Sequence, residues 1–123
     1  MITLHFIKGA SNIHSIRGFW SDGHAHYARR GDPDIVCSAI SVLTINFINS
    51  LYAICEEEIT DKIICDINKD NEFKRMKCIV SLIDSSKPKT SALLDSFYIG
   101  TRDVAKTYGK EYVNIVFEDD YNE

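Results

Sequence analysis

The chain has 123 residues, a formal net charge of −4 and 45% hydrophobic residues. This length suits one compact domain, which can bury a core without a disulfide or a metal to hold it. The last six residues hold four of the acids, and the remainder is balanced at 14 basic and 14 acidic residues, which disfavours a basic nucleic-acid-binding protein. We therefore expect a single domain over residues 1–117, followed by a disordered acidic tail at 118–123.

The first part of the chain reads as a β-hairpin followed by a long loop. Residues 2–7 alternate between apolar and polar side chains, which predicts a strand. Residues 9–12 are typical of a turn, and residues 13–20 read as a second strand. Residues 21–33 show little periodicity, and a loop of this length in a compact domain is a candidate for function.

A run of 21 residues without a charge, 35–55, predicts the first helix. Its length would span a membrane, but six serine, threonine and asparagine residues interrupt it, so we expect a helix buried on most sides and no membrane contact. Helical spacing gives an apolar stripe of Ile40, Leu43, Phe47, Leu51 and Ile54. A second stripe on a different face consists of Cys37, Ser41 and Thr44.

The remaining elements complete a mixed fold. Residues 59–66 and 73–82 alternate again and predict a second hairpin. Apolar spacing predicts a helix over residues 88–108 that ends at Gly109, and residues 112–117 predict a final strand. The fold class is therefore α/β (α+β), in the order ββ-α-ββ-α-β, with a mixed sheet carrying two helices.

The four cysteines are expected to be reduced thiols in a cytoplasmic protein. Their spacings contain no CxxC pair and no zinc-ribbon pattern. The sequence starts on an alternating stretch instead of the basic and apolar run of a secretory signal. Cys55, Cys65 and Cys78 lie in apolar segments and are expected to be buried, where a free thiol behaves as a small hydrophobe.

Cys37 differs from the other cysteines by its position at the start of a helix. Asp34 is a preferred N-cap residue and would place Cys37 in the first turn. The helix dipole favours the thiolate there, so the thiol pKa is expected to fall, and the unpaired amides of that turn could hold an oxyanion. The alternative is that Cys37 is simply a small residue at a helix start.

The loop before Cys37 supplies histidines that could act as its base. His24 is the better candidate, and His26 lies two residues further on. A zinc site of these histidines and Cys37, completed by Asp32 or His14, is disfavoured because metal sites usually show paired ligands at two places and only one pair exists here. We expect no metal and no cofactor.

Two short motifs give the chain a resemblance to a known family. Gly23-His24-Ala25 is followed by Asp34-Ile35-Val36-Cys37 and by small residues up to Ser41. This order resembles the ribosomal-processing cysteine proteases, the Prp family. The loop before Asp34 is one residue longer than the usual pattern.

The resemblance implies an activity and a set of site residues. The enzyme would remove the N-terminal extension of the bacterial large-subunit ribosomal protein L-twenty-seven and would form a homodimer. His24 and Cys37 would be the catalytic dyad, with Gly23, Ala25, Asp34 and Ser41 in supporting positions. We add Trp20 and Tyr27, which flank the loop, as candidates for an aromatic substrate subsite.

Two other functions remain open from the sequence. The first is a non-catalytic module that binds the ribosome or a protein. Its basic residues, Lys69, Lys74, Arg75 and Lys77, alternate on a predicted strand, which usually indicates a solvated face, so we expect no direct contact with nucleic acid. The second is redox sensing at Cys37, which would need a resolving thiol, but Cys55 is roughly 27 Å further along the helix.

Overall fold

The computed structural model describes residues 1–9, 16–29, 31–70 and 73–119, with the side chains of 67–75 left out. In chain order its elements are β1 (Ile2–Lys8), β2 (Ile16–Gly23), α1 (Ile35–Ile54), β3 (Ile64–Asp70), β4 (Phe73–Ile79), α2 (Leu82–Ser85), α3 (Pro88–Tyr108) and β5 (Val113–Glu118). The predicted tail is only partly covered, because Glu118 belongs to β5 and residues 120–123 lie outside the described residues.

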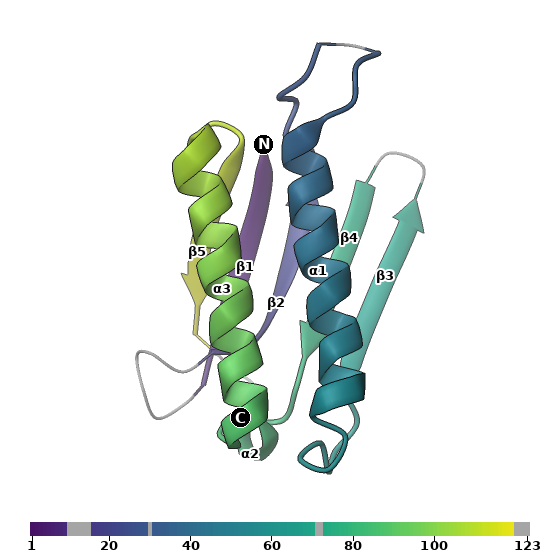
Figure 1. Cartoon of the computed structure of the whole chain (residues 1–123), viewed down its shortest axis with the longest axis vertical. Coiled ribbons are helices and arrows are strands. Elements are labelled where there is room, and N and C mark those ends of the chain that lie inside the picture. The colour runs from purple at the N-terminus through teal and green to yellow at the C-terminus, as the bar shows by residue number, and fades with distance from the viewer. Residues whose placement is uncertain (10–15, 30, 71–72, 120–123) are drawn as a thin grey trace.

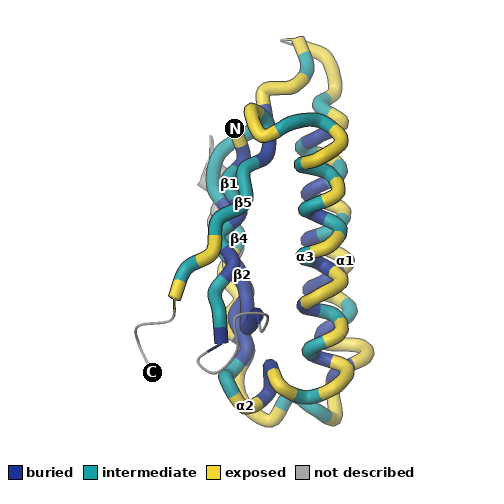
Figure 2. Tube along the Cα trace, turned by 90° about the vertical axis from the view of Figure 1, so that its left-hand side faces the viewer, coloured by how far each residue is buried: buried dark blue, intermediate teal, exposed yellow. Residues whose placement is uncertain are grey.

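The strands form one mixed sheet in the order β3-β4-β2-β1-β5. β1 pairs antiparallel with β2 and parallel with β5, and β4 joins β2 to the edge strand β3. Helices α1 and α3 lie side by side over one face of this sheet (Figures 1 and 2). The predicted α+β class with a mixed sheet is confirmed.

The core fills the space between the sheet and the two long helices. Alternation along β1 and β2 turns Leu4, Phe6 and Phe19 toward the helices, and each is at most 1% exposed. The ring centroid of Phe97 on α3 lies 4.6 Å from that of Phe19 on β2 and 4.7 Å from that of Phe47 on α1. Each such side chain contributes about 1.5–3 kcal/mol by burial, so this aromatic cluster fixes both helices on the sheet.

Helix α1 is covered on one side only, so the expectation of burial on most sides is wrong. Asp34 is its N-cap, as predicted, and Ile40, Phe47 and Leu51 are buried. The opposite face is exposed and apolar: Ile35, Val42, Ile45 and Tyr52 are 49, 65, 52 and 56% exposed. By length and composition alone α1 could cross a membrane, but here it is the helix that covers the sheet beside α3.

Strand β3 begins at Ile64, five residues later than predicted, because the segment before it caps helix α3 instead of joining the sheet. The Glu58 carboxylate accepts hydrogen bonds from the Lys89 and Thr90 amides at 3.2 and 2.9 Å and from the Thr90 hydroxyl at 3.0 Å. These bonds cap α3, whose own N-cap residue makes no side-chain cap. The alternating residues that begin at Ile59 therefore lie in a connection that caps α3, and they do not start a strand.

The short helix α2 was not predicted, and it holds a buried carboxylate. Asp84 is 1% exposed and accepts hydrogen bonds from the Thr60 amide and hydroxyl, the Asp61 amide and the Lys87 ammonium at 2.8–3.1 Å. Ser81 caps α2 by accepting from the Asp84 amide. A helix of four residues is too short to show a helical period in the sequence. The hydrogen-bond network of Asp84 is what holds this helix in place.

Candidate active site

The site begins at Gly23, where β2 ends with its backbone at φ +85°. A Cβ at this position would lie 2.2 Å from the Met1 carbonyl oxygen, so both the backbone angle and the space require glycine. The Met1 ammonium donates a hydrogen bond to the His24 carbonyl oxygen. The start of the loop is therefore fixed against β1, and β2 extends to Gly23 instead of ending near Trp20 as predicted.

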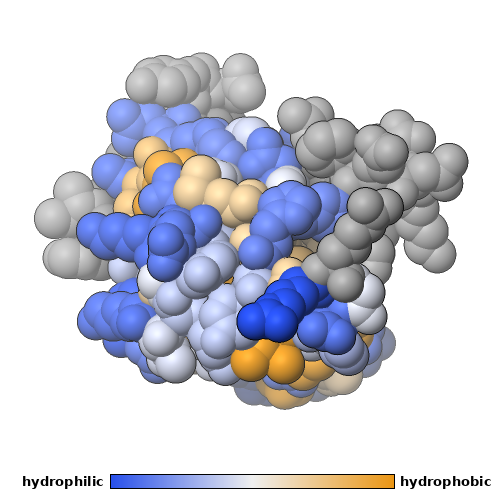
Figure 3. All heavy atoms as spheres, turned by 90° about the horizontal axis from the view of Figure 1, so that it is seen from above, coloured by the Kyte–Doolittle hydropathy of each residue, from blue (hydrophilic) through white to orange (hydrophobic). Residues whose placement is uncertain are grey.

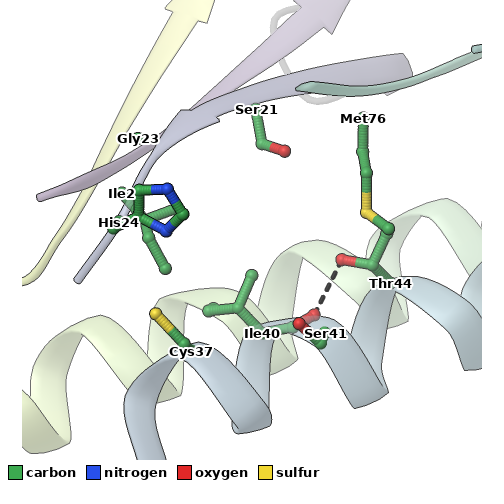
Figure 4. Close-up of a pocket in the computed structure, with 9 residues that line it drawn as sticks. All are labelled: Ile2, Ser21, Gly23, His24, Cys37, Ile40, Ser41, Thr44 and Met76. Carbon is green, nitrogen blue, oxygen red and sulfur yellow. Dashed lines mark hydrogen bonds between the residues drawn. The ribbon is translucent and has the colours of Figure 1, made fainter. Parts of the chain in front are cut away.

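Ala25 brings the loop into contact with the thiol. It is 1% exposed, and its amide donates a hydrogen bond to the Cys37 sulfur at 3.4 Å. Figure 4 shows the Cys37 sulfur pointing from α1 toward the sheet, with the His24 imidazole facing it from the sheet side. The structure thus brings His24 and Cys37 together, as the sequence predicts.

His24 and Cys37 line a cavity of about 140 Å³ between α1 and strands β2 and β4. The predicted second stripe of α1, Cys37, Ser41 and Thr44, forms its helical wall, which also includes Ile40. The sheet supplies Ile2, Ser21 and Met76, which the sequence analysis missed. Alternation from Phe19 gives the clue for Ser21, but Met76 follows only from its register opposite Ser21.

Asp34 links the loop to the helix. One carboxylate oxygen accepts from the Val36 and Cys37 amides at 3.0 and 3.1 Å, and the other accepts from the Tyr27 amide at 3.0 Å. Burial alone would raise the pKa of this carboxyl, but the backbone N–H groups hold it below the usual value. The carboxylate is therefore ionised at neutral pH, and the first-turn amides expected to hold an oxyanion are already engaged.

The environment raises the pKa of the Cys37 thiol, so the expected fall is not seen. Burial is the main cause, and the Asp34 charge and its hydrogen bond with the thiol add to it. The Ala25 amide and the positive Met1 terminus act in the opposite direction without overcoming these effects. Cys37 is therefore a thiol at rest, and its sulfur could act as a nucleophile only after a base has taken the proton.

Neutralising Asp34 should make Cys37 more reactive. In Asp34→Asn we expect the pH midpoint for alkylation of Cys37 by iodoacetamide to fall, because the charge that opposes the thiolate is removed while asparagine still caps the helix. The rate is measured by mass spectrometry of the Cys37 peptide across pH. Asp32→Asn, an exposed loop carboxylate, is the matched control, and an unchanged or higher midpoint in Asp34→Asn would contradict this account.

The two aromatic candidates lie away from the cavity. Trp20 lies between Phe19 and Ser21 on β2 and so projects from the other face of the sheet, where it stacks on His5 at 3.5 Å and donates to Glu118. Contacts with His5 and Glu118 on this face do not support the aromatic substrate subsite that was predicted for Trp20 beside the loop. Tyr27 is 40% exposed and packs against the rings of Tyr108 and Tyr112 at 5.2 and 5.0 Å, at the side of the loop.

The remaining candidates are placed as follows. His26 is exposed, with φ +54°, and its ring lies 5.9 Å from that of His24. Ser41 lines the cavity one turn beyond Cys37 (Figure 4). In the part of the chain that the structure describes, no three histidine, cysteine or acidic side chains lie close enough to hold a metal ion. His14, one possible fourth zinc ligand, lies outside the described residues.

A comparison with protein-family models decides the family. The model of the cysteine protease Prp matches residues 1–114, which include Gly23, His24, Ala25 and Cys37. The chain belongs to the Prp family of cysteine proteases. Prp proteases are peptide hydrolases with a thiol nucleophile, which agrees with a cysteine that faces a histidine across a cavity. A search of curated proteins gave no match.

Solved structures share the fold. The crystal structure of SMU.848 from Streptococcus mutans has a TM-score of 0.76 at 24% identity and covers 98% of this chain and 96% of its own. The essential ribosomal processing protease Prp from S. aureus, in complex with a covalently linked product peptide, has a TM-score of 0.72 at 19% identity, with 96 and 100% covered. The same protease with a substrate peptide has a TM-score of 0.70 at 18% identity and equal coverage.

The end of the molecule that carries the site is mostly hydrophilic. Seen from above, where the loop of residues 24–34 leaves the sheet, hydrophobic residues appear only in smaller groups (Figure 3). The cavity at Cys37 is a small, partly apolar recess, since its lining includes Ile2, Ile40 and Met76 beside polar side chains. Such a recess suits one side chain of a peptide whose other groups stay hydrated.

Proposed function

We propose that this Prp-family protease is a cytoplasmic endopeptidase that removes the N-terminal extension of the large-subunit ribosomal protein L-twenty-seven. The observation that carries the proposal is the position of the Cys37 thiol. It faces His24 in one cavity and accepts a hydrogen bond from the Ala25 amide at 3.4 Å. The S. aureus relative in complex with a substrate peptide adds support for a peptide substrate. The cofactor-free mechanism requires only these groups.

Because the pKa of the Cys37 thiol is raised, the first step is the removal of its proton. His24 takes the proton from Cys37 as the thiolate attacks the scissile carbonyl carbon. A tetrahedral intermediate forms, and its collapse expels the amine, which receives the proton from His24. His24 then activates water, which attacks the thioester and releases the N-terminal fragment.

The oxyanion donor is inferred from the backbone amide that lies closest to the reacting sulfur. Asp34 occupies the Val36 and Cys37 amides, and the Asp34 carbonyl occupies that of Ser38. The Ala25 amide instead donates to the Cys37 sulfur, which in the intermediate is bonded to the same carbon as the oxyanion. We assign the Ala25 amide as an oxyanion donor, a role in which one such hydrogen bond is worth about 10²–10³ in rate.

A direct assay tests the proposal. The purified protein is mixed with the precursor of the ribosomal protein, and the product is identified by mass spectrometry. We expect one cut that leaves the mature N-terminus. A module that only binds, which is the alternative considered from the sequence, would retain the precursor without shortening it. A shortened product from other precursors but not from this one would reject the substrate and keep the protease.

We propose a homodimer, and the outward face of α1 is the surface that favours it. Val42 and Ile45 lie on this uncharged face and are 65 and 52% exposed. An apolar stripe without charges can pack on its own two-fold copy. We expect a dimer by light scattering for the wild type and a monomer for Val42→Glu/Ile45→Glu. Thr107→Glu on the exposed side of α3 is the control, and a dimer that survives the α1 change would place the interface elsewhere.

A further inference from the structure

Two cysteines outside the active site lie opposite each other on the sheet. Cys65 of β3 is the register partner of Cys78 of β4 in an antiparallel pair. Directly opposite residues have Cα atoms about 4.5–5.5 Å apart and side chains on the same face. Disulfides form across Cα separations of roughly 4.4–6.8 Å, so this pair can be bridged without moving the backbone.

The two thiols are already in contact but have unequal access to solvent. Cys78 is 1% exposed, whereas Cys65 lies on the edge strand and is exposed, which corrects the expectation that it is buried. The thiols share a hydrogen bond. Burial, reinforced by Cys65, raises the pKa of Cys78 to about 12, and burial also raises the pKa of Cys65. Because Cys65 is the exposed thiol of the two, it meets an oxidant first.

We propose that Cys65 and Cys78 form a redox modification site, at which a hydroperoxide converts the two thiols into a cross-strand disulfide. The Cys65 thiolate attacks one peroxide oxygen, the O–O bond breaks, and hydroxide leaves and is protonated to water. The Cys78 sulfur then attacks the Cys65 sulfenic sulfur, the S–O bond breaks, and the leaving hydroxide takes the Cys78 proton. Two thiols and one hydrogen peroxide give one disulfide and two waters.

The pair is separate from the other thiols of the chain. Cys37 lies in the cavity on α1, and Cys55 is buried at the C-cap of that helix. Cys65 and Cys78, by contrast, are directly opposite each other on two neighbouring, hydrogen-bonded strands. The site therefore responds to an oxidant independently of the catalytic cysteine.

Peptide mapping tests the proposal. The wild type and Cys37→Ala are treated with equimolar hydrogen peroxide, blocked with an alkylating reagent, digested with trypsin and analysed with and without dithiothreitol. We expect peptides 63–69 and 78–89 to be linked, with the loss of two hydrogens in mass, and to separate on reduction. Cys65→Ser should abolish the link, and Cys55→Ser, the buried control, should keep it.

A stability measurement provides the second readout. The disulfide closes a loop between the two strands, so oxidation should raise the thermal midpoint by roughly 5–10 °C in the wild type but not in Cys65→Ser, and dithiothreitol should reverse the shift. A stable sulfenic or sulfinic acid on Cys65, a Cys65–Cys65 link between two chains, or a link to Cys37 would overturn the proposal.

Discussion

Cys37→Ala should reduce cleavage of the ribosomal precursor by at least about 10³-fold, because it removes the only thiol among the residues that line the cavity and water has no activated substitute. Cys37→Ser should be nearly as inactive, since a hydroxyl has a much higher pKa than a thiol and His24 is a weak base for it. Cleavage is followed by mass spectrometry under single-turnover conditions. Cys55→Ser, which changes a thiol outside the cavity, is the matched control and should cut at a rate near that of the wild type.

The base is tested in the same assay. His24→Ala should lose about 10²–10⁴ in rate, the usual contribution of a general base. His26→Ala should stay within a few-fold of the wild type, because its exposed ring does not line the cavity. If His24→Ala cuts normally and His26→Ala does not, the base is His26 and the loop must rearrange on binding. Activity in Cys37→Ala itself would reject the nucleophile.

Asp84→Ala should cost about 3–5 kcal/mol of the free energy of unfolding, the second large effect that we expect. The change leaves the half-buried Lys87 ammonium and the Thr60 hydroxyl without the carboxylate that joins them, and it leaves the Thr60 and Asp61 amides without their acceptor. This is a large part of the total of about 5–15 kcal/mol typical of a domain. Urea unfolding measures it, and Asp61→Ala, an exposed neighbour, should change stability by less than about 1 kcal/mol.

The Asp84 carboxylate also makes the free energy of unfolding depend on pH in the acid range. Although burial opposes it, hydrogen bonds from Lys87, Thr60 and Asp61 hold the pKa of Asp84 well below its usual range. Its stabilisation is therefore complete above the unfolded-state pKa of about 4 and is lost as the pH falls from there toward the folded-state pKa. In Asp84→Asn this acid-sensitive part of the stability should be absent. An equal slope in both proteins below pH 4 would show that other carboxylates govern acid unfolding.

The sequence predicted the parts of the site that depend on local chemistry. An uncharged run with Asp34 before it is enough to start α1 at Ile35, and the histidine of a Gly-His-Ala turn is close in sequence to Cys37. The glycine itself has a tertiary reason, the approach of the Met1 carbonyl. That reason is visible only once β1 and β2 are paired.

The remaining errors arose where one segment acts on another that is distant in sequence. The thiol pKa depends on how deeply the loop buries Cys37, which outweighs the helix dipole. Glu58 takes its segment out of the sheet because it caps α3, which starts thirty residues later. Alternation alone does not separate an edge strand from a central one, so Cys65 was expected to be buried.

The parallel pairing of β1 with β5 has a consequence for the order of folding. It joins Ile2 to Val113, near the two ends of the described chain, so its loop-closure entropy is large and the pairing should form late. The β1–β2 hairpin and the Cys37 helix can assemble before it. Tyr27, however, packs on Tyr112 just before β5. The loop that carries His24 is therefore expected to acquire its final packing after the rest of the site, when the last strand docks.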